Sequence, residues 1–115
     1  ALSGARVLVL GVTFKEDCPD LRNSRALDLV QMLSATGASV DAFDPWADPR
    51  GAHDMGGVTL ADEPAAGAYD AVVLAVAHRQ FRELDVDAIR ALGVPDVVVY
   101  DVKSAWPRQA VDDRL

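Results

Sequence analysis

The chain has 115 residues, which suits a single domain with one hydrophobic core. Half of the residues are hydrophobic and a quarter are charged, as is typical of a globular protein. The formal net charge of -7 argues against nucleic acid and against an anionic membrane surface as partners, because both require a basic face.

Cysteine content and the first residues point to the cytoplasm. The single cysteine, Cys18, cannot form an intramolecular disulfide, and cysteine-poor chains are typical of reducing compartments. No apolar run is long enough to cross a bilayer, and residues 1–5 lack a signal-peptide pattern. We therefore expect a cytoplasmic protein. A strand so close to the start also suggests a domain of a larger chain.

The first third of the chain has the pattern of a strand, a helix and a second strand. Residues 6–10 form a short apolar run, as expected of a strand buried on both faces of a parallel sheet. From residue 26, apolar side chains recur at the i, i+3, i+4, i+7 spacing of a helix, which Asn23 or Ser24 can cap. A second strand is expected over residues 38–43.

The remainder continues this alternation with weaker signals. We expect a surface loop over residues 47–57 and a short edge strand over residues 58–60. The most apolar run, residues 71–77, predicts a central strand, and residues 97–100 predict the last one. Apolar positions in between indicate short helices, with Asp85 or Asp87 as a possible cap.

This order predicts an α/β fold. Strands that alternate with helices form a three-layer, Rossmann-like open parallel sheet, here of about five strands, with helices on both faces. Residues 1–115 would form one domain. The tail from residue 105, which carries Trp106, is expected to lie over the surface or against another domain.

The loop between the first strand and the first helix, residues 11–24, carries the strongest functional signal. In an open α/β sheet, ligands bind beyond the carboxyl ends of the strands. A tight turn does not require Phe14, Lys15 and Arg22; an aromatic residue with two spaced cations suits a flat, anionic, hydroxylated ligand. The alternative is that Phe14 fills the core under the loop and that both cations are simply solvated.

Two further cations belong to the same predicted edge. Lys103 follows the last strand, so the topology brings it near the loop that carries Lys15 and Arg22. Arg25, like Arg22, lies near the start of the first helix, where the helix dipole disfavours a cation and a nearby anion would relieve that cost.

Three other polar residues have alternative readings. Asp44 ends the second strand, where dinucleotide folds carry an acidic residue for a ribose, but the second glycine of G-x-G-x-x-G is missing after Gly11. A turn residue is therefore the favoured interpretation of Asp44. His78 ends the central strand and is either a general base or a histidine packed beside the site. His53 has no partner at metal-ligand spacing, so we expect no metal site.

Four motifs together resemble one family. They are Val9 to Ser24 (VLGVTFKEDCPDLRNS), Asp44-Pro45-Trp46, residues 74–78 (LAVAH) and residues 100–103 (YDVK). Their order and spacing are similar to those of the C-terminal domain of the UDP-glucose/GDP-mannose dehydrogenases, over nearly the whole chain. The first motif looks most like the branch that oxidises UDP-N-acetylhexosamines for capsule, Vi-antigen or O-antigen polysaccharides.

The resemblance implies a larger NAD-dependent enzyme that oxidises C6 of a UDP-hexose or UDP-N-acetylhexosamine twice, to the uronic acid. An N-terminal domain would bind most of the NAD. A middle segment would carry the catalytic cysteine and mediate dimerisation, so the full-length enzyme would be a homo-oligomer. The partners of this domain would be the UDP-sugar and the rest of its own polypeptide, and the fragment alone would be inactive.

The resemblance also assigns residues. Phe14 and Lys15 match a substrate-contacting pair, Lys103 matches an Arg or Lys that contacts the UDP-sugar, and Arg22 matches an arginine that reaches the NAD. No catalytic residue is carried over to this chain. Cys18 stands where other members carry Thr or another residue, and its acidic neighbours would raise a thiol pKa, so it is not expected to be a nucleophile.

A rival hypothesis is a stand-alone α/β nucleotide-binding or regulatory module without catalysis, such as a receiver-like domain. Receiver domains need an acidic cluster after the first strand and a phosphorylatable Asp after the third. Here those strands end in Gly-Val-Thr-Phe-Lys and Ala-Val-Ala-His, which argues against that class. A structural or assembly role through Trp46 and Trp106 is a further alternative.

Overall fold

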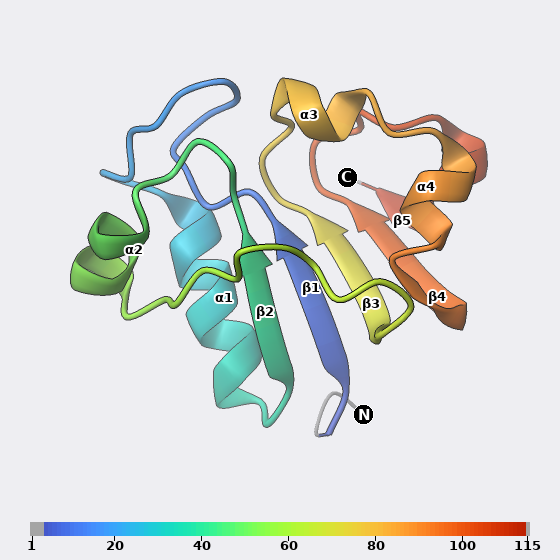
Figure 1. Cartoon of the computed structure of the whole chain (residues 1–115), viewed down its shortest axis with the longest axis horizontal. Helices are drawn as coiled ribbons and strands as arrows, with labels where there is room; N and C mark the ends of the chain where they lie inside the picture. Colours follow the sequence, from blue (N-terminus) through green and yellow to red (C-terminus); the bar gives the residue numbers. More distant parts are fainter. Residues whose placement is uncertain (1–3, 115) are drawn as a thin grey trace.

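The computed structural model, which describes residues 4–114, is an open parallel sheet flanked by helices (Figure 1). All the neighbouring strands pair in parallel, in the order β2-β1-β3-β4-β5. The strands are β1 (Arg6–Leu10), β2 (Ser39–Phe43), β3 (Tyr69–Leu74), β4 (Gly93–Asp101) and the two-residue β5 (Asp113–Arg114). The expected α/β parallel fold is therefore confirmed.

Helices cover both faces of the sheet and complete three layers. On one face α1 (Arg25–Ala35) and α2 (Pro49–Gly56) pack over β1 and β2; on the other lie α3 (Arg79–Arg82) and α4 (Val86–Arg90) (Figure 1). A 3-10 turn, η1 (Arg108–Ala110), follows β4. Each face has its own apolar core, because alternate β1 residues point to opposite sides.

Strand β1 positions the site because it is an interior strand of the sheet and is buried. Residues 7–10 are almost inaccessible, as expected of a strand covered on both faces. Gly11 ends it with a positive φ of 93°, and a Cβ there would lie 2.5 Å from the Cβ of Val76. A glycine is therefore required where the loops after β1 and β3 pass each other.

The expected surface loop over residues 47–57 is wrong, because it contains the eight-residue helix α2. Asp48 caps the helix by accepting bonds from the backbone N–H groups of Arg50 and Gly51, at 3.3 Å each. Pro49 occupies the first turn, and Gly57 ends the helix in the left-handed conformation. These helix start and stop signals are present in the sequence, but the polar composition of the segment led to the prediction of a loop.

The sheet edges also differ from expectation. Residues 58–60 do not form a strand; Leu60 makes an isolated bridge to Ala42, and the short β5 lies at the opposite edge. Strand β4 begins four residues earlier than expected and includes Pro95. A shift in the β3–β4 register leaves Pro95 outside the paired positions, so its missing N–H costs no ladder bond.

Trp106 belongs to the core and not to the surface. Its side chain is buried among β3, β4, α3 and α4 residues, and its indole N–H donates to the backbone oxygen of Phe81 at 2.8 Å. The surface position expected for the tail is therefore wrong for Trp106, whereas residues 107–109 are exposed. The role of Trp106 is to close the core beneath α3.

Candidate functional site

A cavity of about 350 Å³ lies at the carboxyl end of the sheet, where the loops after β1, β3 and β4 meet. Phe14 comes from the first of these loops and Lys103 from the third, so the structure brings these two predicted residues together. Asn23 and Arg25 contribute further polar groups from the start of α1. The remaining lining residues are Thr13, Ala26, Leu29, Ala75, Val76 and Val102.

Phe14 is half exposed, at 50% relative accessibility, and is not a core residue. The alternative in which it fills the core under the loop is therefore wrong. An aromatic face at the mouth of a cavity with cationic walls can stack against a flat ring. Phe14 is thus available for contact with a ligand.

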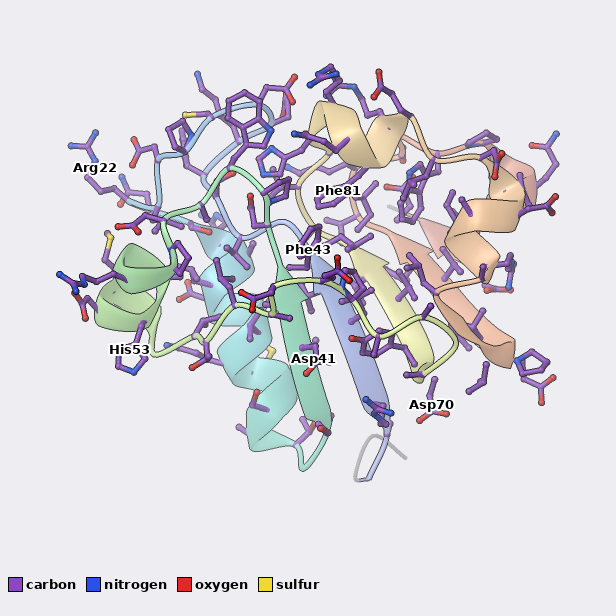
Figure 2. All side chains as sticks on the ribbon, viewed as in Figure 1. Arg22, Asp41, Phe43, His53, Asp70 and Phe81 are labelled. Carbon is purple, nitrogen blue, oxygen red and sulfur yellow. The ribbon has the colours of Figure 1, made fainter. Side chains whose placement is uncertain are left out.

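Lys15 and Arg22 do not line this cavity, although the sequence grouped them with Lys103. Arg22 forms a bidentate pair with Asp20, with Nε–Oδ1 and Nη2–Oδ2 distances of 3.1 Å. Figure 2 shows Arg22 on the outer side of the loop, pointing away from the sheet, and its side chain is 79% exposed. Hydrogen bonds from Arg22 lower the pKa of the Asp20 carboxyl, so this pair stays ionised.

Of the cations that the sequence singled out, Arg25 and Lys103 line the cavity. Arg25 is the first residue of α1, and within residues 4–114 its guanidinium has no carboxylate partner. A cation at a helix N-terminus is disfavoured by the dipole unless an anion is close. Arg25 and Lys103 therefore make this cavity a favourable place for a negatively charged group.

Asp44 is a buried anchor that joins the first two strands. Its Oδ1 accepts bonds from the backbone N–H groups of Trp46 and Ala47, at 2.7 and 3.1 Å. Its Oδ2 accepts bonds from those of Val12 and Thr13, at 2.7 and 3.3 Å. Both oxygens are thus occupied, which supports the turn interpretation over a ribose contact.

The charge of Asp44 is stabilised within the protein. Burial by itself raises the pKa of Asp44, but hydrogen bonds from His78 and from the Val12 and Trp46 backbone outweigh it, and the pKa lies below its ordinary value. His78 is also fully buried, and its two ring nitrogens contact the backbone N–H of Asp17 and the carboxylate of Asp44. This arrangement favours the packed-histidine alternative over a general base, because both nitrogens have partners within the protein and His78 does not line the cavity.

Asp17 is a structural residue that sequence reasoning missed. Its carboxylate accepts from the backbone N–H of Arg79 at 2.6 Å and from Nη2 of Arg82 at 3.0 Å, so it caps α3 from a distant loop. The bond from Arg79 is the main cause that lowers the pKa of Asp17. No local signal could reveal a cap supplied from 62 residues away.

The described residues contain neither a metal-binding cluster nor a membrane-spanning helix. Among the described residues, no group of three or more His, Cys, Asp or Glu side chains is arranged to hold a metal ion. Over the same part of the chain, every helix is too short or too polar to span a membrane. Cys18 is half-buried in the loop after β1 and lies outside the cavity.

Comparison with known proteins adds what geometry alone does not give. Residues 8–108 match the model of the UDP-glucose/GDP-mannose dehydrogenase family, UDP binding domain. The chain is 44% identical over 114 residues to the UDP-N-acetyl-D-glucosamine 6-dehydrogenase of Pseudomonas aeruginosa and 40% identical over 114 residues to the Salmonella typhi protein of that name. Each alignment covers 99% of this chain and 27% of the relative.

A solved structure agrees with the sequence comparison. A UDP-glucose dehydrogenase from Pyrobaculum islandicum superposes with a TM-score of 0.71 at 29% identity, over 98% of this chain and 25% of that one. The chain thus spans about a quarter of the length of these relatives. Because the match covers most of the described residues, the chain belongs to the UDP-glucose/GDP-mannose dehydrogenase family, as its UDP binding domain.

Proposed function

We propose that this chain is the nucleotide-sugar-binding domain of an NAD-dependent UDP-sugar 6-dehydrogenase that supplies uronic acids for surface polysaccharides. The observation that carries the proposal is 44% identity, over 99% of the chain, to a UDP-N-acetyl-D-glucosamine 6-dehydrogenase. The preferred substrate class is a UDP-N-acetylhexosamine. We propose further that the full-length enzyme is a cytoplasmic homo-oligomer.

The cavity at the end of the sheet supports a role in binding the nucleotide. A UDP group carries two phosphates and a flat uracil ring. In the proposal, Lys103 and Arg25 oppose the phosphate charge, and Phe14 contacts a flat face of the ligand. Lys15, which is exposed one residue after Phe14, contacts the part of the UDP-sugar that extends beyond the cavity.

NAD is held mainly by the remainder of the polypeptide in this proposal. The residues here fit a secondary role: Asp44 is already fully hydrogen-bonded, and Gly11 is needed for packing against Val76, so neither is free for a dinucleotide. Arg22 is exposed and can reach a group across a domain interface. Bound NAD would supply the hydride acceptor for the sugar C6, and Arg22 would orient the cofactor.

This domain would contribute binding and exclusion of water rather than bond-breaking chemistry. Cations in a cleft of reduced dielectric hold phosphates more strongly than in water. Closure over the sugar would also shield a thioester intermediate formed on a cysteine elsewhere in the enzyme.

The test is NADH absorbance with the full-length protein, NAD and a panel of nucleotide sugars. We expect turnover with a UDP-N-acetylhexosamine and two NADH formed for each sugar consumed, because the alcohol is oxidised to the acid. UDP-glucose and GDP-mannose serve as comparison substrates. Absence of turnover with every sugar would contradict the proposal and favour a nucleotide-binding module without catalysis.

A further inference from the structure

His78 is a fully buried titratable side chain to which the proposed function assigns no role. It follows β3 and directly precedes α3. Its Nδ1 lies 2.9 Å from the backbone nitrogen of Asp17. Its Nε2 lies 2.9 Å from Oδ2 of Asp44 and 3.2 Å from Oγ1 of Thr13. Both nitrogens therefore connect to the segment that follows β1 or to its anchor.

These contacts determine which nitrogen carries the proton. A ring nitrogen that accepts a bond from a backbone N–H must present a lone pair, so Nδ1 is unprotonated. The ring is then neutral, and its proton resides on Nε2, facing the carboxylate of Asp44. His78 thus acts as an acceptor towards Asp17 and as a donor towards Asp44.

The two partners of His78 hold opposite ends of one segment, residues 12–17. At the start, Oδ2 of Asp44 accepts from the backbone N–H groups of Val12 and Thr13. At the end, the backbone N–H of Asp17 donates to His78. The histidine ring closes the link between the two ends.

Asp17 needs this support because its backbone is unfavourable. Its φ of 55° lies in the left-handed region, which costs free energy for a residue other than glycine. Its backbone N–H bond to His78 and its carboxylate bonds to Arg79 and Arg82 all favour that conformation. Loss of the His78 acceptor would leave a partly buried N–H without its partner and would release the turn.

The histidine ring itself packs against two aromatic side chains. The ring of Trp46 stacks against it with centroids 6.0 Å apart, and the ring of Phe81 lies 5.7 Å away. By contrast, Phe14 and Lys15 are exposed, so their own packing does not hold the segment in place. Within the segment, the backbone N–H of Phe14 donates to the backbone oxygen of Asp20 at 2.7 Å, and the Thr13 hydroxyl donates to the backbone oxygen of Lys15 at 3.0 Å. The same hydroxyl lies 3.2 Å from Nε2 of His78, so the histidine supports the interior of the segment as well as its end.

We propose that His78 is a positioning residue: it holds residues 12–17 in the conformation that presents Phe14 and Lys15 to the nucleotide sugar. The inference rests on the proposed function, since it needs a ligand at Phe14 and Lys15. A segment fixed before binding loses less conformational entropy when the ligand arrives. His78 therefore acts on substrate affinity without touching the substrate.

Three substitutions in the full-length enzyme separate the two bonds. In His78→Asn, the amide oxygen can replace Nδ1 as the acceptor for Asp17, while the donor to Asp44 is lost. In His78→Gln, the amide nitrogen can still reach Asp44, but no acceptor remains for Asp17. His78→Ala loses both bonds. Ile89→Ala, at a fully buried site on α4, is the matched control for a general loss of stability.

The substitutions are expected to change the KM for the nucleotide sugar but not the KM for NAD. His78→Ala and His78→Gln should raise the KM for the nucleotide sugar about tenfold and leave the KM for NAD within about twofold. His78→Asn should restore most of the affinity, and Ile89→Ala should lower Tm without changing either KM. A wild-type sugar KM in His78→Gln, or an equal rise in Ile89→Ala, would overturn the inference.

Hydrogen exchange at the Asp17 amide gives a readout that needs no substrate. It should be faster in His78→Gln and His78→Ala than in His78→Asn, because only asparagine supplies an acceptor. If the wild-type enzyme turns over no nucleotide sugar, the proposed function fails. Faster exchange in His78→Gln than in His78→Asn would even then support the positioning of the segment, and equal exchange would overturn it.

Discussion

Arg22 and Arg25 lie three residues apart but have different surroundings. Arg22 is paired with Asp20 on the outside of the loop, whereas Arg25 lines the cavity together with Lys103. A cation that already has a carboxylate partner gains less from a new anion than an unpaired one. The two arginines should therefore respond to different ligands, and substitution can separate them.

Arg25→Ala should weaken the binding of the nucleotide sugar. Loss of one charge-assisted hydrogen bond to a phosphate should raise the KM for the sugar about tenfold, with little change in the KM for NAD. Arg50→Ala removes an exposed arginine from α2 and is the control for net charge. Steady-state kinetics of the full-length enzyme measure both constants. A sugar KM equal to that of Arg50→Ala would exclude Arg25 from the site.

Arg22→Ala should affect the KM for NAD and not the KM for the nucleotide sugar. Its exposed guanidinium is proposed to reach NAD, so the KM for NAD should rise about fivefold while the sugar KM is retained. Asp20→Ala is an informative companion, because it frees Arg22 from its pair without removing the cation. Normal NAD saturation in Arg22→Ala would argue against this role.

At the scale of elements, Asp44 connects β1, β2 and the segment after β3 through buried hydrogen bonds. Its pKa in the folded protein lies below the ordinary value of 3.8. A depressed pKa stabilises the folded state at pH values above the unfolded pKa. That contribution is lost as the pH falls below about 4 and through the folded pKa.

Asp44→Asn should therefore lower the free energy of unfolding at pH 7 by about 2 kcal/mol or more, because buried N–H groups lose a charged acceptor. The same variant should lose less stability than the wild type as the pH falls below about 4. Urea unfolding across this pH range measures both effects. Asp96→Asn, at an exposed position in β4, is the control. The prediction would be contradicted if the free energy of unfolding fell equally with decreasing pH in both variants.

Elements with strong local signals could be predicted from the sequence. The apolar runs gave β1 and most of β3, and Ser24 caps α1 as proposed, with its Oγ accepting from the backbone N–H of Leu27 at 3.3 Å. Helix α2 was missed although Asp48, Pro49 and Gly57 mark its ends, because its polar surface resembles a loop.

The site could be predicted only in part, because strand topology places the loops but not the direction of their side chains. The rule that strands end at one edge correctly brought Phe14 and Lys103 together. It could not determine which way each side chain of the loop points, so it grouped Lys15 and Arg22 with Arg25 and Lys103, although only the last two line the cavity. The Asp17–His78 contact joins residues 61 positions apart and depends on tertiary packing, which no local pattern encodes.

At the scale of the whole molecule, the chain covers about a quarter of its relatives, and chemistry is proposed to require the remainder. Residues 1–115 expressed alone should fold, since each face of the sheet has its own core. They should form no NADH from NAD and a UDP-sugar, whereas the full-length protein should. Turnover by the isolated domain would contradict this division of labour.

Calorimetric titration of UDP into the full-length protein tests most directly whether this domain holds the nucleotide of the substrate. The wild-type protein should bind one UDP per chain. Lys103→Ala should lower the affinity for UDP about tenfold and leave the affinity for NAD unchanged. Arg108→Ala, at an exposed cation in η1 outside the cavity, should bind UDP like wild type. UDP affinity that is unaffected by Lys103→Ala, or no UDP binding at all, would contradict the account.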